Sequence, residues 1–138
     1  MLKGVDALVG PELLLLLAEM GHGDVLAVVD RNYPAHSSGV PVVELATDLV
    51  SALRAILTLF PVDTFIDPPA WHMLQDDGSA GPAMPDVQVE LDATEGRSVP
   101  FAGTTRPDFY AAARGAYVVV RTVETRPYAC VLLSKGVV

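Results

Sequence analysis

The stretch that decides the fold is Met20-Gly21-His22-Gly23-Asp24, followed by Val25-Leu26-Ala27-Val28-Val29 and Asp30. The five apolar residues are continuous rather than alternating, which predicts a strand buried on both faces of a parallel sheet. Asp30 then stands at the carboxyl end of this strand, where open α/β sheets bind ligands. His22 stands at the other end, roughly 20 Å away at about 3.3 Å per residue. Either the loops fold back to join the two side chains, or the site lies between subunits.

The composition limits the class of protein. With 138 residues, the chain is long enough for a single domain, residues 1–138, and too short for two ordinary ones. Hydrophobic residues make up 51% and charged residues only 19%. We therefore expect another subunit to cover part of the apolar surface. The net charge of −8 disfavours nucleic acid and an anionic membrane surface as partners.

The cysteine count and the amino terminus indicate a compartment. Cys130 is the one cysteine, which excludes an internal disulfide and is typical of a reducing cytosol. The first residues contain no apolar region of the signal-peptide kind, and the apolar run 13–18 is too short to span a bilayer. We therefore expect a cytoplasmic protein.

The order of the expected elements indicates an α/β fold. Strands are predicted over 25–29, 40–45, 62–66, 99–102, 117–123 and 128–133, and helices over 11–20, 47–59, 86–93 and 106–114. Strand, helix and strand in succession predict a parallel sheet with right-handed crossovers. The short turn 124–127 predicts that the last two strands are antiparallel neighbours, so the sheet is mixed. Residues 70–85 are expected to be irregular.

Several helix signals carry specific expectations. Five consecutive leucines, 13–17, point all round the first helix, so we expect it to be buried on several sides. Gly21 is placed to end this helix with a left-handed cap, and Gly23 is not needed for one. Thr47 and Thr105 are the expected caps of two later helices. A strand is the alternative to the helix predicted over 86–93, because Val87, Val89 and Leu91 alternate with polar residues.

His22 is the strongest candidate for a general acid or base, because an imidazole exists in both protonation states near neutral pH. The alternative is a histidine that fills a turn and bonds a backbone carbonyl. Asp30 could anchor a hydroxyl group, or could be a solvated strand end beside Arg31. Arg106 lies at a helix start, where a cation gains nothing from the helix dipole, so it hints at a use elsewhere. A surface arginine is the alternative.

Other side chains are weaker candidates. Tyr128 could offer its phenol to a ligand or could belong to the core. His36 and His72 could line a polar pocket, although surface loops are the commoner place for such residues. An aromatic residue such as Tyr33 or Trp71 could cover the apolar face of a ligand.

The sequence favours neither a metal nor a cofactor. A zinc site made of His22, His36 and His72 is an alternative, but no pair has metal-ligand spacing on one helix. Residues 21–23 precede a strand, whereas the glycines of a dinucleotide fingerprint follow one. No phosphate-binding glycine loop and no nucleophile elbow for serine hydrolysis is present.

A set of short motifs runs along most of the chain. They are Leu2-Lys3, Pro11-Glu12-Leu13-Leu14, Leu17-Ala18-Glu19-Met20-Gly21-His22-Gly23-Asp24, Asp30, Pro34-Ala35-His36-Ser37, Phe109-Tyr110 and Lys135-Gly136-Val137. Together they resemble the L-fucose mutarotases and their relatives, the D-ribose pyranases. The Gly-His-Gly-Asp and Pro-Ala-His-Ser motifs together resemble the fucose branch, because the ribose branch lacks the second motif.

The resemblance implies a fold, an activity and an assembly. The implied fold is a three-layer α/β/α single domain with a mixed, mainly parallel sheet. The implied activity is a cofactor-free mutarotase acting on L-fucose or a related monosaccharide. The implied assembly is a homo-oligomeric ring, a pentamer or a decamer of two stacked pentamers.

The resemblance also implies roles for single residues. By position, His22 is similar to the proton donor of the family, and Asp30 and Arg106 to its sugar contacts. The segment Tyr128-Ala129-Cys130 falls on the carboxyl-terminal binding segment. That segment usually ends in asparagine, so Cys130 is a departure, and a thiol is a weak hydrogen-bond partner. His36 and Trp71 are further candidate substrate contacts.

The chemistry of anomer exchange fits these residues. A proton leaves the anomeric hydroxyl, another reaches the ring oxygen, and the ring opens to an aldehyde that closes on its other face. His22 could supply the proton and take it back. Two other classes stay open at this point: a non-catalytic sugar-binding oligomer on the same fold, and a metal-dependent enzyme that uses the histidines.

Overall fold

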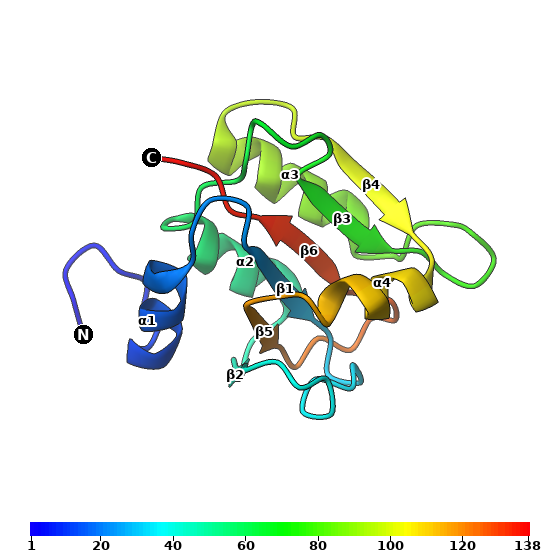
Figure 1. The fold of residues 1–138 in the computed structure, drawn as a ribbon, viewed down its shortest axis with the longest axis horizontal. Coiled ribbons are helices and arrows are strands. Elements are labelled where there is room, and N and C mark those ends of the chain that lie inside the picture. Colours follow the sequence, from blue (N-terminus) through cyan, green and yellow to red (C-terminus); the bar gives the residue numbers. More distant parts are fainter.

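The computed structural model describes all 138 residues and contains four helices and six strands. The helices are α1 (Pro11–Glu19), α2 (Leu49–Leu57), α3 (Met84–Glu95) and α4 (Arg106–Ala113). The strands are β1 (Val25–Val29), β2 (Val42–Glu44), β3 (Ala70–Met73), β4 (Phe101–Thr104), β5 (Val118–Arg121) and β6 (Val131–Ser134). All six strands form one sheet in the order β2-β5-β1-β6-β3-β4 (Figure 1).

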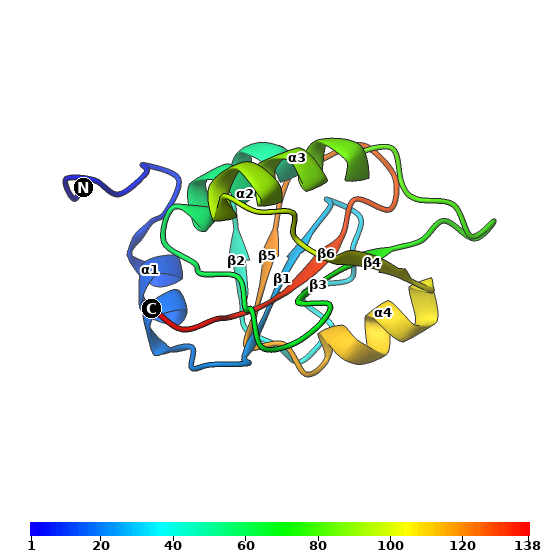
Figure 2. The ribbon, with the colours of Figure 1, turned by 90° about the horizontal axis from the view of Figure 1, so that it is seen from above.

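The sheet is the middle of three layers. Figure 2 shows α2 and α3 over one face of the sheet and α4 over the other. Leu53 of α2 and Leu91 of α3 belong to the larger core cluster, while Phe109 of α4 belongs to the smaller one together with Val29. Because β1 lies in the interior of the sheet, Leu26 to Val29 are completely buried. The three-layer α/β/α fold expected from the sequence is confirmed.

One strand runs against the other five. The pairs β1–β5, β2–β5 and β3–β4 are parallel, and β6 pairs antiparallel with both β1 and β3. The mixed, mainly parallel sheet is therefore confirmed, but the prediction that β5 and β6 are neighbours is wrong. Strand β1 lies between β5 and β6. After β5 the chain crosses the end of β1, where the Thr122 N–H donates to the Val29 carbonyl.

The strand predicted over 62–66 is also wrong. Only Val62 forms a bridge, with Lys135. The Asp63 carboxylate accepts hydrogen bonds from the N–H groups of Phe65 and Ile66, at 3.2 and 2.9 Å, so this segment folds into a turn. The strand at this point of the chain is β3, inside the stretch expected to be irregular.

Helix ends depart from the sequence expectations in two places. Helix α1 stops at Glu19 with Met20 as an extended C-cap, and Gly21 is not left-handed; the left-handed residue is Gly23, with φ of 86°. The cap of α2 is Asp48, which accepts from the Ser51 N–H, rather than Thr47. The helix at 86–93 is confirmed and extended in α3, and the Thr105 cap of α4 is confirmed.

The leucine run of α1 is only half buried. Leu13 and Leu17 face the core, whereas the side of the helix carrying Leu15 is open and Leu15 itself is 59% exposed. The expectation of a helix buried on several sides is therefore wrong for the single chain. None of the four helices combines the length and the apolar character needed to cross a lipid bilayer.

Candidate functional site

A cavity of about 190 Å³ lies at the edge of the sheet where the five parallel strands end. Asp30 follows β1, Met73 ends β3, Arg106 begins α4 just after β4, and Cys130 precedes the reversed strand β6. The full lining is Asp30, Asn32, Tyr33, Met73, Arg106, Tyr110, Pro127, Tyr128 and Cys130. The fold thus brings together five residues that the sequence singled out, namely Asp30, Tyr33, Arg106, Tyr128 and Cys130, at the edge where α/β sheets bind ligands.

Asp30 presents one carboxylate oxygen to this cavity. Its Oδ1 accepts hydrogen bonds from the backbone N–H groups of Asn32 and Tyr33, at 2.9 and 3.0 Å. Its Oδ2 has a thiol as its only protein partner, the Cys130 Sγ at 3.6 Å. Since a thiol is a weak donor, Oδ2 keeps most of its capacity to accept a hydrogen bond from a ligand.

Cys130 and Tyr33 supply protonated groups to the lining of the same cavity. Burial raises the pKa of the Cys130 thiol, and the neighbouring charge of Asp30 raises it further, so the sulfur stays protonated. Burial, followed by the proximity of Cys130, raises the pKa of Tyr33 to about 12. The phenol of Tyr33 is therefore a donor at physiological pH, and its ring meets that of Tyr110 edge-on at 5.4 Å.

Arg106 supplies the positive charge of the cavity. It begins α4, and its Nε lies 3.3 Å from Oδ1 of Asp76, an exposed carboxylate. The cavity therefore contains an available carboxylate oxygen, a guanidinium group and phenols within one small volume. Such a set matches a small polar ligand with several hydroxyl groups.

His22 lies at the opposite edge of the sheet, in the turn between α1 and β1. Its Nε2 is 2.9 Å from Oδ1 of Asp63, and its ring packs edge-on against Phe65 with the centroids 5.3 Å apart. The side chain of His22 is 44% exposed, whereas that of Asp63 is fully buried. His22 also lines a second, largely apolar cavity of about 400 Å³ formed by α1 and the carboxyl-terminal residues.

Asp63 is the functional candidate that the sequence did not reveal. Burial alone would raise its pKa, but hydrogen bonds from the N–H groups of Phe65 and Ile66, and from His22, hold the pKa of this carboxyl below its usual value. An ionised carboxylate only accepts, so Nε2 of His22 carries the proton of this bond. Nδ1 is then the nitrogen left for proton exchange. No local pattern marks Asp63, because its partner lies 41 residues away.

The end of β6 fixes the turn that holds His22. The Gly23 N–H donates to the Lys135 carbonyl at 2.8 Å, and the Lys135 N–H donates to the Asp24 carbonyl at 2.9 Å. The Lys135 ammonium group donates to the Leu17 and Met20 carbonyls at the end of α1. The main chain of Lys135 therefore ties the turn to the end of β6, and its half-buried side chain ties the end of α1 to the same place.

The remaining sequence candidates do not line the cavity. Ala129 is buried in the core, and His36 pairs with Glu44 of β2 at 2.8 Å. Trp71 lies within β3 and packs against the smaller core cluster. His72, on the same strand, is buried with an unpartnered Nδ1. No three histidine, cysteine or acidic side chains converge in a way that could hold a metal ion, so the three histidines do not form a common site.

Comparison with known proteins identifies the family of the chain. Residues 3–138 match the family described as the RbsD / FucU transport protein family. The chain belongs to this family. It is 38% identical over 140 residues to the L-fucose mutarotase of Histophilus somni, an alignment that covers 99% of this chain and 97% of that protein.

Solved structures of the family share the fold over nearly the whole chain. FucU from Bifidobacterium longum is 38% identical and superposes with a TM-score of 0.92, covering 99% of both chains. The fucose mutarotase from Streptococcus pneumoniae, solved in complex with L-fucose, is 31% identical and superposes equally well, again over 99% of both chains. The architecture described above is thus that of the family.

Proposed function

We propose that the protein is a sugar mutarotase, an isomerase that interconverts the α and β anomers of L-fucose or a related monosaccharide. The observation that carries the proposal is the cavity in which Asp30 keeps one carboxylate oxygen available close to Arg106 and several phenols. Family members of similar sequence are named L-fucose mutarotases, and one was solved with L-fucose bound.

The cavity side chains hold the sugar. Oδ2 of Asp30 accepts a hydrogen bond from one hydroxyl group, and the Arg106 guanidinium donates to another oxygen of the same ring. Tyr128 and Tyr33 add phenols to the wall. Charged donors and acceptors fix the orientation of a hydroxylated ligand more strongly than neutral ones, because such hydrogen bonds are about twice as strong.

His22 exchanges the protons. The hydroxyl on the anomeric carbon loses its proton, the ring oxygen gains one, and the bond between the anomeric carbon and the ring oxygen breaks to give an aldehyde. Rotation and closure on the other face restore the ring with inverted configuration. No electrons pass between molecules, so the reaction requires no redox cofactor. Asp63 keeps the imidazole in one tautomer, which leaves Nδ1 to give and take the proton.

The two halves of the site come from different subunits. His22 and the cavity lie at opposite edges of one sheet, with the whole of β1 between them. The surface beside His22 is apolar: Phe65 is 73% exposed and Ile66 is 44% exposed. We propose that this surface packs on a neighbouring copy and places His22 at the neighbour's cavity, in a homo-oligomeric ring, a pentamer or a decamer. The one buried thiol suits a cytoplasmic enzyme.

One NMR experiment tests the proposal. Anomer exchange is measured by saturation transfer for fucose, ribose, galactose and rhamnose, with the protein present and absent. We expect faster exchange for fucose than in buffer, abolition of the gain in His22→Ala, and weakened sugar binding in Asp30→Asn. Unchanged exchange for every sugar contradicts the proposal. Binding without faster exchange identifies a sugar-binding oligomer instead.

A further inference from the structure

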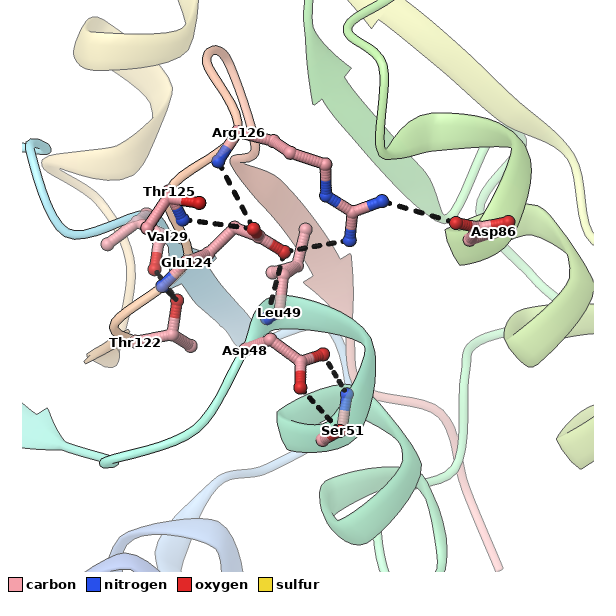
Figure 3. Close-up of polar contacts among 9 residues, drawn as sticks. All are labelled: Val29, Asp48, Leu49, Ser51, Asp86, Thr122, Glu124, Thr125 and Arg126. Atoms are coloured by element: carbon pink, nitrogen blue, oxygen red, sulfur yellow. Dashed lines mark hydrogen bonds and ion pairs between the residues drawn. The ribbon is translucent and has the colours of Figure 1, made fainter.

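Glu124 is a buried carboxylate in the loop that leads to the cavity residues Pro127 and Tyr128, but it is not part of the lining. Its side chain is only 5% exposed, and both oxygens accept hydrogen bonds (Figure 3). Oε1 accepts from the Leu49 N–H at 3.4 Å and from Arg126 Nη2 at 2.8 Å, while Oε2 accepts from the N–H groups of Thr125 and Arg126 at 3.0 and 3.1 Å. Burial raises the pKa of Glu124, but the bonds from Arg126 outweigh it and hold the pKa below its usual value.

These bonds tie one loop to three elements of the fold. Leu49 is the first residue of α2, and Arg126 reaches across to Asp86 of α3 at 3.2 Å (Figure 3). The backbone carbonyl of Glu124 accepts from the Arg31 N–H, next to Asp30 at the end of β1. The loop 124–126 is therefore fixed against two helices and the sheet at once.

Two residues further along, the chain adopts an unusual conformation. Tyr128 has φ of 56° and is the only non-glycine residue with a positive φ. The left-handed region is unfavourable for a residue with a Cβ atom and persists where the surroundings impose it. Tyr128 also packs closely against Gly81. A Cβ atom on Gly81 would lie 3.1 Å from the Tyr128 carbonyl oxygen and 3.3 Å from the Tyr128 Cβ.

We propose that Glu124 is a positioning residue for the sugar site, which holds the segment 124–128 so that Tyr128 stays left-handed in the cavity wall. The inference rests on the proposed function, since contact between Tyr128 and a sugar is part of that function. Glu124 acts through Tyr128 and does not touch the ligand. A purely structural role, as an anchor for α2, would instead lower stability and leave the site unchanged.

The first test follows the segment itself and needs no ligand. Hydrogen–deuterium exchange is compared in the wild type, Glu124→Gln and the control Glu90→Gln. Glu90 also pairs with an arginine, Arg54, across α2 and α3, but does not reach the loop. We expect amide exchange at residues 125–130 to rise at least about tenfold in Glu124→Gln, which corresponds to the loss of one charged hydrogen bond, and to stay unchanged in Glu90→Gln. Unchanged exchange in folded Glu124→Gln overturns the proposal.

A second variant covers the case in which Glu124→Gln does not fold. Arg126→Met removes the guanidinium but leaves Glu124 its three backbone donors. We expect the amides of residues 125–130 to exchange faster than in the wild type, with a smaller increase in rate than in Glu124→Gln. Exchange at wild-type rates in Arg126→Met then overturns the proposal.

The second test links the segment to the ligand through a double-mutant cycle. The Kd for L-fucose is measured for Glu124→Gln, Tyr128→Phe and the double variant. We expect Glu124→Gln alone to weaken binding about tenfold and the combined effect to be smaller than the product of the two single effects. Multiplicative effects overturn the action through Tyr128. If the wild type binds no sugar of the panel, the proposed function fails, while the exchange experiment still decides whether Glu124 holds Tyr128.

Discussion

Nε2 of His22 donates to Oδ1 of Asp63 across 2.9 Å, so a half-exposed imidazole is fixed by a fully buried carboxylate. The carboxylate in turn is held by two backbone N–H groups of its own turn. A rigid acceptor of this kind orients the ring and fixes its tautomer. The pair therefore supports the proposed proton transfer at the other ring nitrogen.

Replacing Asp63 by asparagine is expected to slow anomer exchange by about 10²- to 10⁴-fold, the usual contribution of a correctly oriented general acid or base. An asparagine can donate as well as accept, so it no longer holds the imidazole in one tautomer. Saturation-transfer NMR measures the rate. Glu95→Gln is the control, since Glu95 only accepts from the Val62 N–H nearby. Exchange at the wild-type rate in Asp63→Asn would show that the pair is merely structural.

Mixed oligomers test whether the site is shared between subunits. His22→Ala and Asp30→Asn should each be inactive alone, because each lacks one half of every site. In rings assembled at random from equal amounts, about a quarter of the interfaces carry both intact halves. We expect about a quarter of the wild-type exchange rate after the two variants are unfolded and refolded together. A mixture as inactive as its parents argues for a site within one chain.

Acid sensitivity near neutral pH should come from His72. Burial lowers the pKa of His72 below its ordinary value of 6.5, partly offset by a hydrogen bond with Met73. Below pH 6.5 the unfolded chain takes up a proton that the folded chain resists, so the free energy of unfolding should fall as the pH drops through this window. Urea unfolding of wild type and His72→Leu between about pH 5 and 7 checks this, where carboxyl groups with lowered pKa values do not titrate.

The matching control is His36→Leu, which changes an exposed side chain. We expect the slope of stability against pH to flatten in His72→Leu and to persist in His36→Leu. A slope that survives in His72→Leu would assign the acid sensitivity to other groups.

The two glycines beside His22 should respond differently to alanine. Gly23 has φ of 86°, so Gly23→Ala is expected to lower the free energy of unfolding by about 1–2 kcal/mol. Gly21 is not left-handed, and a Cβ atom there would meet only Asp24 Oδ2 at an ordinary 3.7 Å. Gly21→Ala should therefore be neutral or slightly stabilising. Chemical denaturation compares the two variants, and equal losses would contradict the backbone geometry.

Gly21 and Gly23 also show which features can be predicted from the sequence and which cannot. Local signals predict β1 and its flanking residues, because a continuous apolar run and an acid at its end depend on near neighbours only. They do not distinguish which glycine is left-handed, since that depends on the hydrogen bond from Gly23 to Lys135, far along the chain. The placement of β6 between β1 and β3, and hence the contact of Cys130 with Asp30, arises from the same long-range pairing.

The roles of side chains divide in the same way, into those that local sequence predicts and those that depend on long-range contacts. Asp30, Arg106, Tyr128 and Cys130 could be selected from the sequence, and the fold gathers them in one cavity. Asp63 could not be selected, because nothing next to it in the chain distinguishes it from other acids in turns. Its importance comes from a residue that the fold brings to it.

The reversed direction of β6 restricts how the gene can change. One end of this strand enters at Cys130, beside the cavity, and the other leaves at Lys135, which holds the His22 turn. An insertion or deletion of one codon between them would turn every following side chain to the opposite face of the sheet. A single such change would then disturb both the cavity at Cys130 and the His22 turn at Lys135. We therefore expect the spacing from Cys130 to Lys135 to tolerate no length polymorphism, while the exposed residues 76–79 of the β3–α3 connection are free to vary in length.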